Sequence, residues 1–200
     1  KDFGFDGIEV RGLGNKRFTG PGRPLSEEQW PHTKQKLEEL RLEISCLSSG
    51  CCLKFAEKAE ENHNELVRYI TLAGKLGTPY IRILGDSEPQ PTGAVDDQVV
   101  LAALRRLIPI AEANQVTLLV ETSGAYADTK RLGQLLNQVA SDAIGALWDI
   151  HHPYRFAGET PEQTVQHLGA YIKYVHVKDS VVVDNVIQYR MLGEGTLPIA

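Results

Sequence analysis

Residues 116–150 read VTLLVETSGAYADTKRLGQLLNQVASDAIGALWDI, and this stretch decides the fold class. It opens with an apolar run at 116–121, rich in β-branched residues, which predicts a buried strand. A helix is expected from about 128 to 140, and a second apolar strand at 144–150. Near-continuous apolar runs are typical of parallel strands that are covered on both faces. The stretch therefore predicts a β-α-β unit.

The same alternation of short strands and longer helices continues on both sides of this unit. Further strands are expected at 7–10, 42–47, 79–84 and 171–179, and further helices at 26–40, 55–76, 96–114 and 162–168. A hairpin signal occurs only near the end, at 180–190. This order indicates one α/β domain over residues 1–200 with a parallel sheet, which both a doubly wound sheet and a (β/α)8 barrel satisfy.

Composition and charge exclude several classes of protein. The net charge is −5 and no dense stripe of Lys and Arg exists, which argues against nucleic acid binding. No apolar run reaches the length of a membrane span. The three cysteines form no disulfide framework and no zinc motif, so we expect a reducing, cytoplasmic environment. Dinucleotide-binding, P-loop and HExxH motifs are absent from the sequence.

Polar side chains collect where the expected strands end. Glu121, Asp149 and His176 each stand near the end of a different strand, and His152 and Lys178 follow closely behind two of them. In a parallel sheet these strand ends share one face, which is where ligands bind. Buried carboxylates are costly without a compensating cation. Two carboxylates and one imidazole suit Mn²⁺, Mg²⁺, Co²⁺ or Zn²⁺, so we expect one divalent metal ion.

Each of these residues also has a structural interpretation. A carboxylate after a strand often caps a helix, so both interpretations stay open for Glu121, and Asp149 could close a turn. We favour function for Asp149 because it precedes the last apolar residue of its strand and should face inward. A lone His176 would more often be a core histidine. Glu9 ends the first strand and could reach the same rim, but we favour a structural role for it, and we expect His151 to be structural.

Two expectations concern neighbouring residues. The vicinal pair Cys51 and Cys52 should line a loop near the mouth of the site, without acting as a nucleophile because no base is identifiable nearby. Asp179 should orient Lys178 or His176 without binding the metal itself.

Five segments, taken in order, resemble one family: GFDGIEVRG, LLVETSG, WDIHHPYR, YVHVKD and LGEGTLPI. They are similar to the xylose isomerase-like TIM-barrel superfamily, which holds sugar and sugar phosphate isomerases and epimerases, inosose dehydratase-like proteins and, more distantly, endonuclease IV. The resemblance covers nearly the whole chain. It implies a (β/α)8 barrel with one divalent metal ion at its C-terminal face. It also implies that the first and last strands are not in the chain, so that the barrel is incomplete.

The resemblance implies roles for individual residues. In similar ketose 3-epimerases the metal is held by Glu, Asp, His and a second Glu on the last four strands. Glu121, Asp149 and His176 match the first three, and the fourth is expected beyond Ala200. His152 matches a substrate-binding histidine.

The chain also departs from the pattern of that superfamily. Ala127 stands where some sugar epimerases carry another Glu, and Val182 stands where an Arg is expected, with Lys178 or Arg190 as substitutes. These departures weaken the assignment to free-ketose epimerases more than the metal site. The strands at 42–47 and 79–84 hold no histidine, which, with the acidic charge, argues against the endonuclease branch.

The function we expect is that of a divalent-metal-dependent isomerase or epimerase acting on a small sugar or polyol, phosphorylated or free. Glu121 would remove the proton alpha to a carbonyl, giving an enediolate that the metal stabilises. His152 would act as a second catalytic residue, which hydrogen-bonds a substrate oxygen and stabilises its negative charge. Lys178 would bind a substrate hydroxyl or phosphate. A metal-dependent lyase resembling inosose dehydratase and a non-catalytic sugar-binding barrel are the alternatives. Barrels of this type often form homodimers, but the sequence locates no interface.

Overall fold

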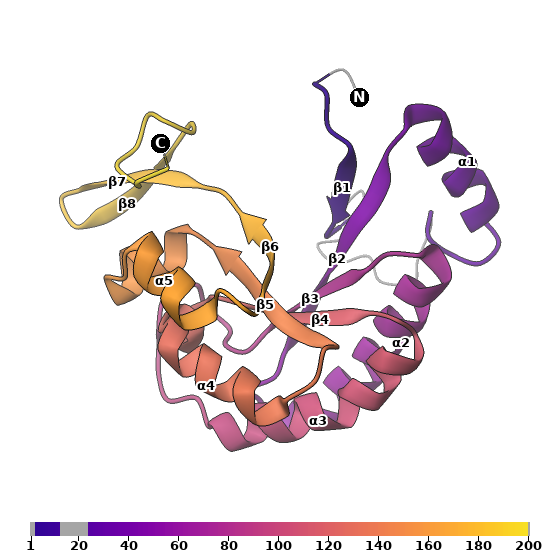
Figure 1. Ribbon diagram of the computed structural model, residues 1–200, viewed down its shortest axis with the longest axis horizontal. Coiled ribbons are helices and arrows are strands. Elements are labelled where there is room, and N and C mark those ends of the chain that lie inside the picture. The colour runs from indigo at the N-terminus through magenta and orange to yellow at the C-terminus, as the bar shows by residue number, and fades with distance from the viewer. Residues whose placement is uncertain (1–2, 13–23, 200) are drawn as a thin grey trace.

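The computed structural model describes residues 3–12 and 24–199. Six parallel strands form its centre and curl into an open half-barrel (Figure 1). They are β1 (Gly7–Val10), β2 (Glu43–Cys52), β3 (Tyr80–Leu84), β4 (Thr117–Glu121), β5 (Ile144–Asp149) and β6 (Ile172–His176). Their spatial order is their sequence order. A doubly wound sheet would reverse that order at a switch point, so the fold is an incomplete (β/α)8 barrel.

Helices cover the outer, convex side of the curved sheet (Figure 1). They are α1 (Trp30–Leu40), α2 (Ala59–Leu76), α3 (Asp97–Ala113), α4 (Thr129–Val139) and α5 (Pro161–Leu168), with short helical turns at Ala56–Lys58, Gly124–Ala127 and Pro153–Ala157. Side chains cap three of these helices: Asp96 accepts from the Gln98 N–H, Asp128 accepts from the Arg131 N–H, and Thr160 forms a capping box with Gln163. The predicted β-α-β alternation is confirmed.

The hydrophobic core lies between the sheet and the helices. Strand β4 shows how the two faces divide: Leu118 and Val120 belong to this core, whereas Leu119 and Glu121 alternate onto the inner face of the half-barrel. Burial of each large core side chain contributes about 1.5–3 kcal/mol to stability. This alternation puts the last residue of β4 on the inner face as a buried carboxylate.

Helix α1 begins at Trp30, and the prediction of a start at Ser26 was wrong. Residues 24–29 form turns instead, in which the Ser26 carbonyl accepts from the N–H groups of Gln29 and Trp30. The Ser26 hydroxyl has no hydrogen-bond partner and caps nothing. Proline is favoured in the first turn of a helix, so Pro31 fixes the start at this later position.

The expected strand at 171–179 divides into two elements. Strand β6 ends at His176, and β7 (Asp179–Val183) pairs with β8 (Val186–Arg190) as an antiparallel hairpin that projects beyond β6 (Figure 1). Asp184 and Asn185 both have positive φ, as a two-residue type I′ turn requires. The hairpin signal at 180–190 is therefore confirmed, with a start one residue earlier.

Asp179 has a role different from the one expected. Its buried carboxylate accepts hydrogen bonds from the backbone N–H groups of Ser180, Gly193, Gly195 and Leu197, and orients neither Lys178 nor His176. A Cβ on Gly195 would collide with this carboxylate, which explains a glycine there. The carboxylate therefore fastens the segment after β8 to the base of the hairpin.

The Asp179→Ala variant should release residues 191–197, because four backbone N–H groups lose their acceptor. Burial raises the pKa of Asp179, but the four donors outweigh it and hold that pKa below its ordinary value. The stabilisation is therefore present at neutral pH and is lost as the pH falls through the lowered pKa. Limited proteolysis should show faster cleavage after Met191 in this variant than in Glu194→Ala, which removes an exposed carboxylate of the same segment. Equal cleavage rates would contradict the fastening role.

Candidate metal centre

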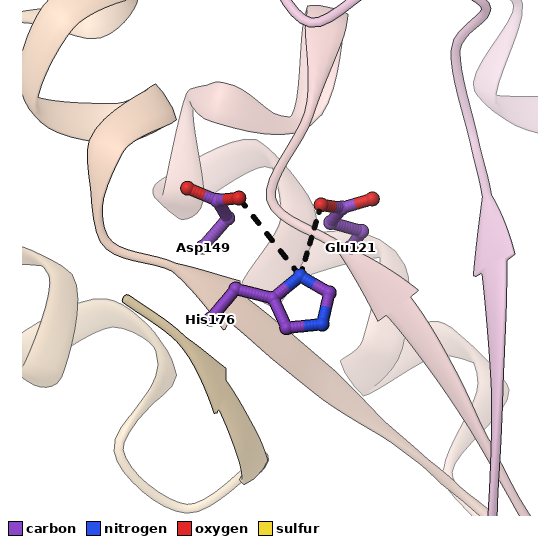
Figure 2. A group of neighbouring side chains, drawn as sticks. All are labelled: Glu121, Asp149 and His176. Carbon is purple, nitrogen blue, oxygen red and sulfur yellow. Dashed lines mark ion pairs between the residues drawn. The ribbon is translucent and has the colours of Figure 1, made fainter. Parts of the chain in front are cut away.

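Three side chains from consecutive strands converge on the inner face of the half-barrel (Figure 2). Glu121 is the last residue of β4, Asp149 of β5 and His176 of β6, and each offers one ligand atom within 4.8 Å of the other two. Nδ1 of His176 lies 3.5 Å from Oε1 of Glu121 and 3.9 Å from Oδ2 of Asp149. We call these three residues the metal centre. Parallel pairing explains their meeting, because it aligns the carboxyl ends of β4, β5 and β6.

The donor set fits a divalent cation. Both carboxylates are buried, with Glu121 2% and Asp149 0% exposed. Oδ1 of Asp149 accepts from the backbone N–H of His151, but Oδ2 accepts no hydrogen bond, although it forms an ion pair with the Lys178 ammonium. The Lys178 ammonium neutralises this oxygen in the structure, and the convergence of two buried carboxylates with an imidazole nitrogen makes the position suitable for a divalent cation as well. Two carboxylate oxygens and one imidazole nitrogen suit Mn²⁺, Mg²⁺, Co²⁺ or Zn²⁺.

Arg82 on β3 is a member of the site that sequence reasoning missed. Its Nε donates to Oε2 of Glu121 at 2.7 Å, a second guanidinium nitrogen forms an ion pair with the same oxygen, and a third donates to the Ser49 carbonyl. Burial alone would raise the pKa of Glu121, but His176 and Arg82 lower it to about 2. The missed signal was an arginine inside the apolar run PYIRIL, where a charge needs a buried partner.

Glu9, expected to be structural, reaches the same site from β1. Its Oε2 accepts from Nε2 of His176 at 2.7 Å, and its Oε1 accepts from the Ser48 hydroxyl at 2.6 Å. Burial lowers the pKa of His176, but the carboxylates of Glu121 and Glu9 outweigh it and raise that pKa to about 9. In the absence of a metal ion, the ring is therefore an imidazolium between carboxylates at neutral pH.

His152 and Lys178 both lie beside the metal centre, as their positions in the sequence indicated. Nδ1 of His152 donates to the Thr122 carbonyl at 3.0 Å, because a carbonyl can only accept. Burial lowers the pKa of His152, so the ring is neutral and its Nε2 is an acceptor, 3.5 Å from Nζ of Lys178. Nε2 could therefore accept a hydrogen bond from a substrate hydroxyl. A neutral acceptor would not stabilise negative charge on a substrate oxygen, which is the role expected for His152 from the sequence. Arg190 lies exposed on β8 and donates to Gln188.

Other residues considered from the sequence lie outside the metal centre. Nε2 of His151 pairs with the Ser180 hydroxyl at the base of the hairpin, and burial lowers the pKa of His151 to about 4. Cys51 and Cys52 lie in strand β2 and not in a loop, so that expectation was wrong. Both are buried, and burial raises the pKa of Cys51 to about 12. A thiol of this kind is unreactive at neutral pH.

An open depression of about 450 Å³ leads to the metal centre. It is lined by Glu9, Arg11, Ser48, Arg82, Glu121, Tyr174, Val175, His176, Val177 and Lys178. This volume lies in the range of sites for small organic ligands. The polar lining suits a hydroxylated molecule, because its hydroxyl groups would find both donors and acceptors there. Elsewhere, no helix among residues 3–12 and 24–199 combines the length and the apolar character needed to cross a membrane.

Sequence comparison identifies a family for the whole chain. The family model described as xylose isomerase-like TIM barrel matches residues 1–200. A search of the curated proteins found no match.

Several solved structures share the fold. A xylose isomerase-like TIM-barrel protein from Mycobacterium smegmatis, in complex with magnesium, has a TM-score of 0.68 at 20% identity over 90% of this chain and 64% of that one. A probable 3-DHS dehydratase from Bacillus anthracis has a TM-score of 0.72 at 19% identity, covering 92% and 67%. The 3-keto-D-glucoside 4-epimerase from E. coli has a TM-score of 0.72 at 16% identity, covering 98% and 75%. This chain therefore spans about two thirds to three quarters of their lengths, and the likeness shows the fold.

Proposed function

The chain belongs to the xylose isomerase-like TIM-barrel family, and from this premise we propose that it carries the metal centre of an isomerase or epimerase acting on a small sugar or polyol. The observation that supports the proposal best is the convergence of Glu121, Asp149 and His176 from three consecutive strands within 4.8 Å of one another. The open depression beside them is polar and large enough for a monosaccharide. The E. coli neighbour named as an epimerase adds support at the level of the fold.

Glu121, Asp149 and His176 would hold the cation through one atom each, the atoms that face one another in Figure 2. A divalent cation at this position supplies Lewis-acid stabilisation of the negative charge that develops on a substrate oxygen. The protein contributes the geometry, since Arg82 holds Oε2 of Glu121 and leaves Oε1 toward the centre.

The remaining roles follow from which atoms are donors and acceptors. Glu121 would take the proton from the carbon next to the substrate carbonyl. Because Oε1 faces the cation, Oε2, which accepts from Arg82, is the oxygen left for this proton. Nε2 of the neutral His152 would accept a hydrogen bond from a substrate hydroxyl. The Lys178 ammonium, which is partly exposed beside Asp149, would donate to a substrate hydroxyl or phosphate.

A lyase is the second candidate, favoured by the Bacillus anthracis neighbour whose name is that of a probable dehydratase. Dehydration begins with the same removal of a proton alpha to a carbonyl, after which a hydroxyl group leaves from the next carbon. The same residues would serve this reaction. The two candidates differ in the product, because only the lyase releases water and forms a conjugated carbonyl that absorbs in the ultraviolet.

The test is proton exchange in D₂O with the full-length protein loaded with Mn²⁺, Mg²⁺, Co²⁺ or Zn²⁺. A panel of free and phosphorylated ketoses, together with inososes, is followed by NMR for deuterium uptake beside the carbonyl and by mass spectrometry for loss of water. Uptake that Glu121→Gln abolishes and Glu43→Gln preserves would support the proposal, since Glu43 is an exposed carboxylate on β2. Binding of metal and sugar without exchange on the whole panel would favour a binding protein and overturn the enzymatic assignment.

A further inference from the structure

We propose that Glu9 is a positioning residue that fixes the ring of His176 so that Nδ1 faces the metal centre. The inference rests on the proposed metal site and adds to it a residue from the opposite edge of the sheet. Glu9 lies on β1 and His176 on β6, which are the two outermost strands of the six-stranded sheet. Their side chains meet across the hollow of the half-barrel, at 2.7 Å between Oε2 and Nε2.

Both oxygens of Glu9 have a defined partner. Oε1 accepts from the Ser48 hydroxyl on β2 at 2.6 Å, and Oε2 accepts from Nε2 of His176. The Glu9 side chain is 19% exposed and that of His176 25%, so the pair is largely shielded from water. Ser48 therefore fixes the orientation of the Glu9 carboxylate, and this carboxylate in turn fixes the imidazole.

The chemistry follows from the identity of the two ring nitrogens. A carboxylate only accepts hydrogen bonds, so Nε2 of His176 must carry the hydrogen. When the ring binds a metal, its lone pair is therefore on Nδ1, the nitrogen that lies 3.5 Å from Glu121 and 3.9 Å from Asp149. A carboxylate on the far nitrogen orients a metal-binding histidine and makes it a better donor.

Packing against Tyr174 also restricts the orientation of the His176 ring. Side chains two apart on a strand point the same way, and the ring centroids of Tyr174 and His176 are 5.9 Å apart at nearly right angles. The Tyr174 hydroxyl is bonded to Ser45 across the interior, at 2.9 Å. Tilting of the His176 ring would therefore break either this packing or the bond to Glu9.

Glu9 lies on the side of the His176 imidazole that faces away from the metal centre, so it is not placed to be a metal ligand. It contacts Nε2, whereas the metal centre faces Nδ1, so the imidazole lies between the Glu9 carboxylate and the centre. Among the described residues, the group able to hold a metal comprises Glu121, Asp149 and His176 without Glu9. The role assigned to Glu9 is therefore indirect.

Zinc affinity of the full-length protein tests the proposal, measured by competition with a chromophoric chelator. Glu9→Gln should bind Zn²⁺ about 10- to 100-fold more weakly than the unmodified protein, the usual effect of losing such a partner. Glu9→Asp keeps the charge but shortens the reach, so it should weaken binding as well. Ser48→Ala should have a smaller effect, and Glu43→Gln, an exposed carboxylate on β2, none.

A second readout separates positioning from a general effect on folding. NMR of the zinc-loaded protein labelled with ¹⁵N-histidine should show the Nε2–H proton of His176 downfield and slow to exchange. In Glu9→Gln this proton should move upfield and exchange faster, while the Nε2–H signals of histidines outside the site stay in place. An unchanged proton and unchanged affinity in Glu9→Gln, with binding lost in Asp149→Ala, would overturn the inference and leave the metal site standing. Failure of the unmodified protein to bind Zn²⁺ would overturn both the proposed metal site and the positioning role of Glu9.

Discussion

The Asp149→Ala variant is expected to lose binding of a divalent cation, with affinity reduced by more than about 100-fold, because even loss of an indirect partner costs 10- to 100-fold. Asp149 contributes a fully buried oxygen, Oδ2, that accepts no hydrogen bond and lies 3.9 Å from Nδ1 of His176. Among the described residues, the group able to hold a metal contains one other carboxylate, Glu121, which already supplies its own ligand atom.

The measurement is isothermal titration of the metal-free full-length protein with Mn²⁺ and with Zn²⁺. Asp142→Ala is the matched control, because Asp142 is an exposed aspartate just before β5 and its loss should leave affinity unchanged. In Asp149→Ala the Lys178 ammonium also loses its ion-pair partner, so melting temperatures should be recorded for both variants. A folded Asp149→Ala protein that retains stoichiometric binding would place the metal elsewhere.

The Arg82→Met variant is expected to destabilise the metal-free protein by about 3 kcal/mol, the lower end of the loss seen when one partner of a buried ion pair is removed. The side chains of Arg82 and Glu121 are only 12% and 3% exposed, so the substitution leaves a carboxylate buried without its guanidinium. His176 remains 3.5 Å from Oε1 of Glu121 and supplies partial compensation, which is why the lower end is expected.

Denaturant unfolding of the metal-free protein measures this loss of stability. A double-mutant cycle tests whether the loss comes from the ion pair between Arg82 and Glu121. The pair Arg82→Met with Glu121→Gln should recover part of the stability, because the charge left unpaired by the first change is then removed. Arg68→Met is the control: Arg68 pairs with Glu65 on the surface of α2, and such a pair contributes at most about 1 kcal/mol. Equal losses in Arg82→Met and Arg68→Met would show that the Arg82 pair is solvated.

Much of the fold could be predicted because it depends on local patterns. The apolar runs ending at Glu121 and Asp149 were recognised as parallel strands, and the structure confirms both ends to within one residue. The start of α1 could not be placed, because a good capping residue at Ser26 competed with Pro31 for the same helix. The strand predicted at 171–179 ran past the end of β6 because Val177 continues the alternation begun by Val175, although β6 ends at His176.

The residues of the candidate site also include some that the sequence predicted and one that it did not. Glu121, Asp149 and His176 were found together because parallel pairing aligns the ends of β4, β5 and β6, and strand ends can be read from the sequence. Arg82 was missed because its partner is 39 positions away, and a charged residue inside a strand gives no indication of which carboxylate will neutralise it.

The sequence alone determined that strands and helices alternate, that the sheet is parallel, and that two carboxylates and a histidine share one rim. Local periodicity predicts the strands and their ends, and the rule that parallel strands end at one face then places the three side chains on one rim. Only the tertiary structure decided that Glu9 supports His176, 167 positions away, and that Asp179 fastens a loop. It also decided that Nε2 of His152 is an acceptor, because a backbone carbonyl holds the other nitrogen. The physical reason is that curling the sheet brings β1 opposite β6, and no local pattern encodes which side chains then meet across the interior.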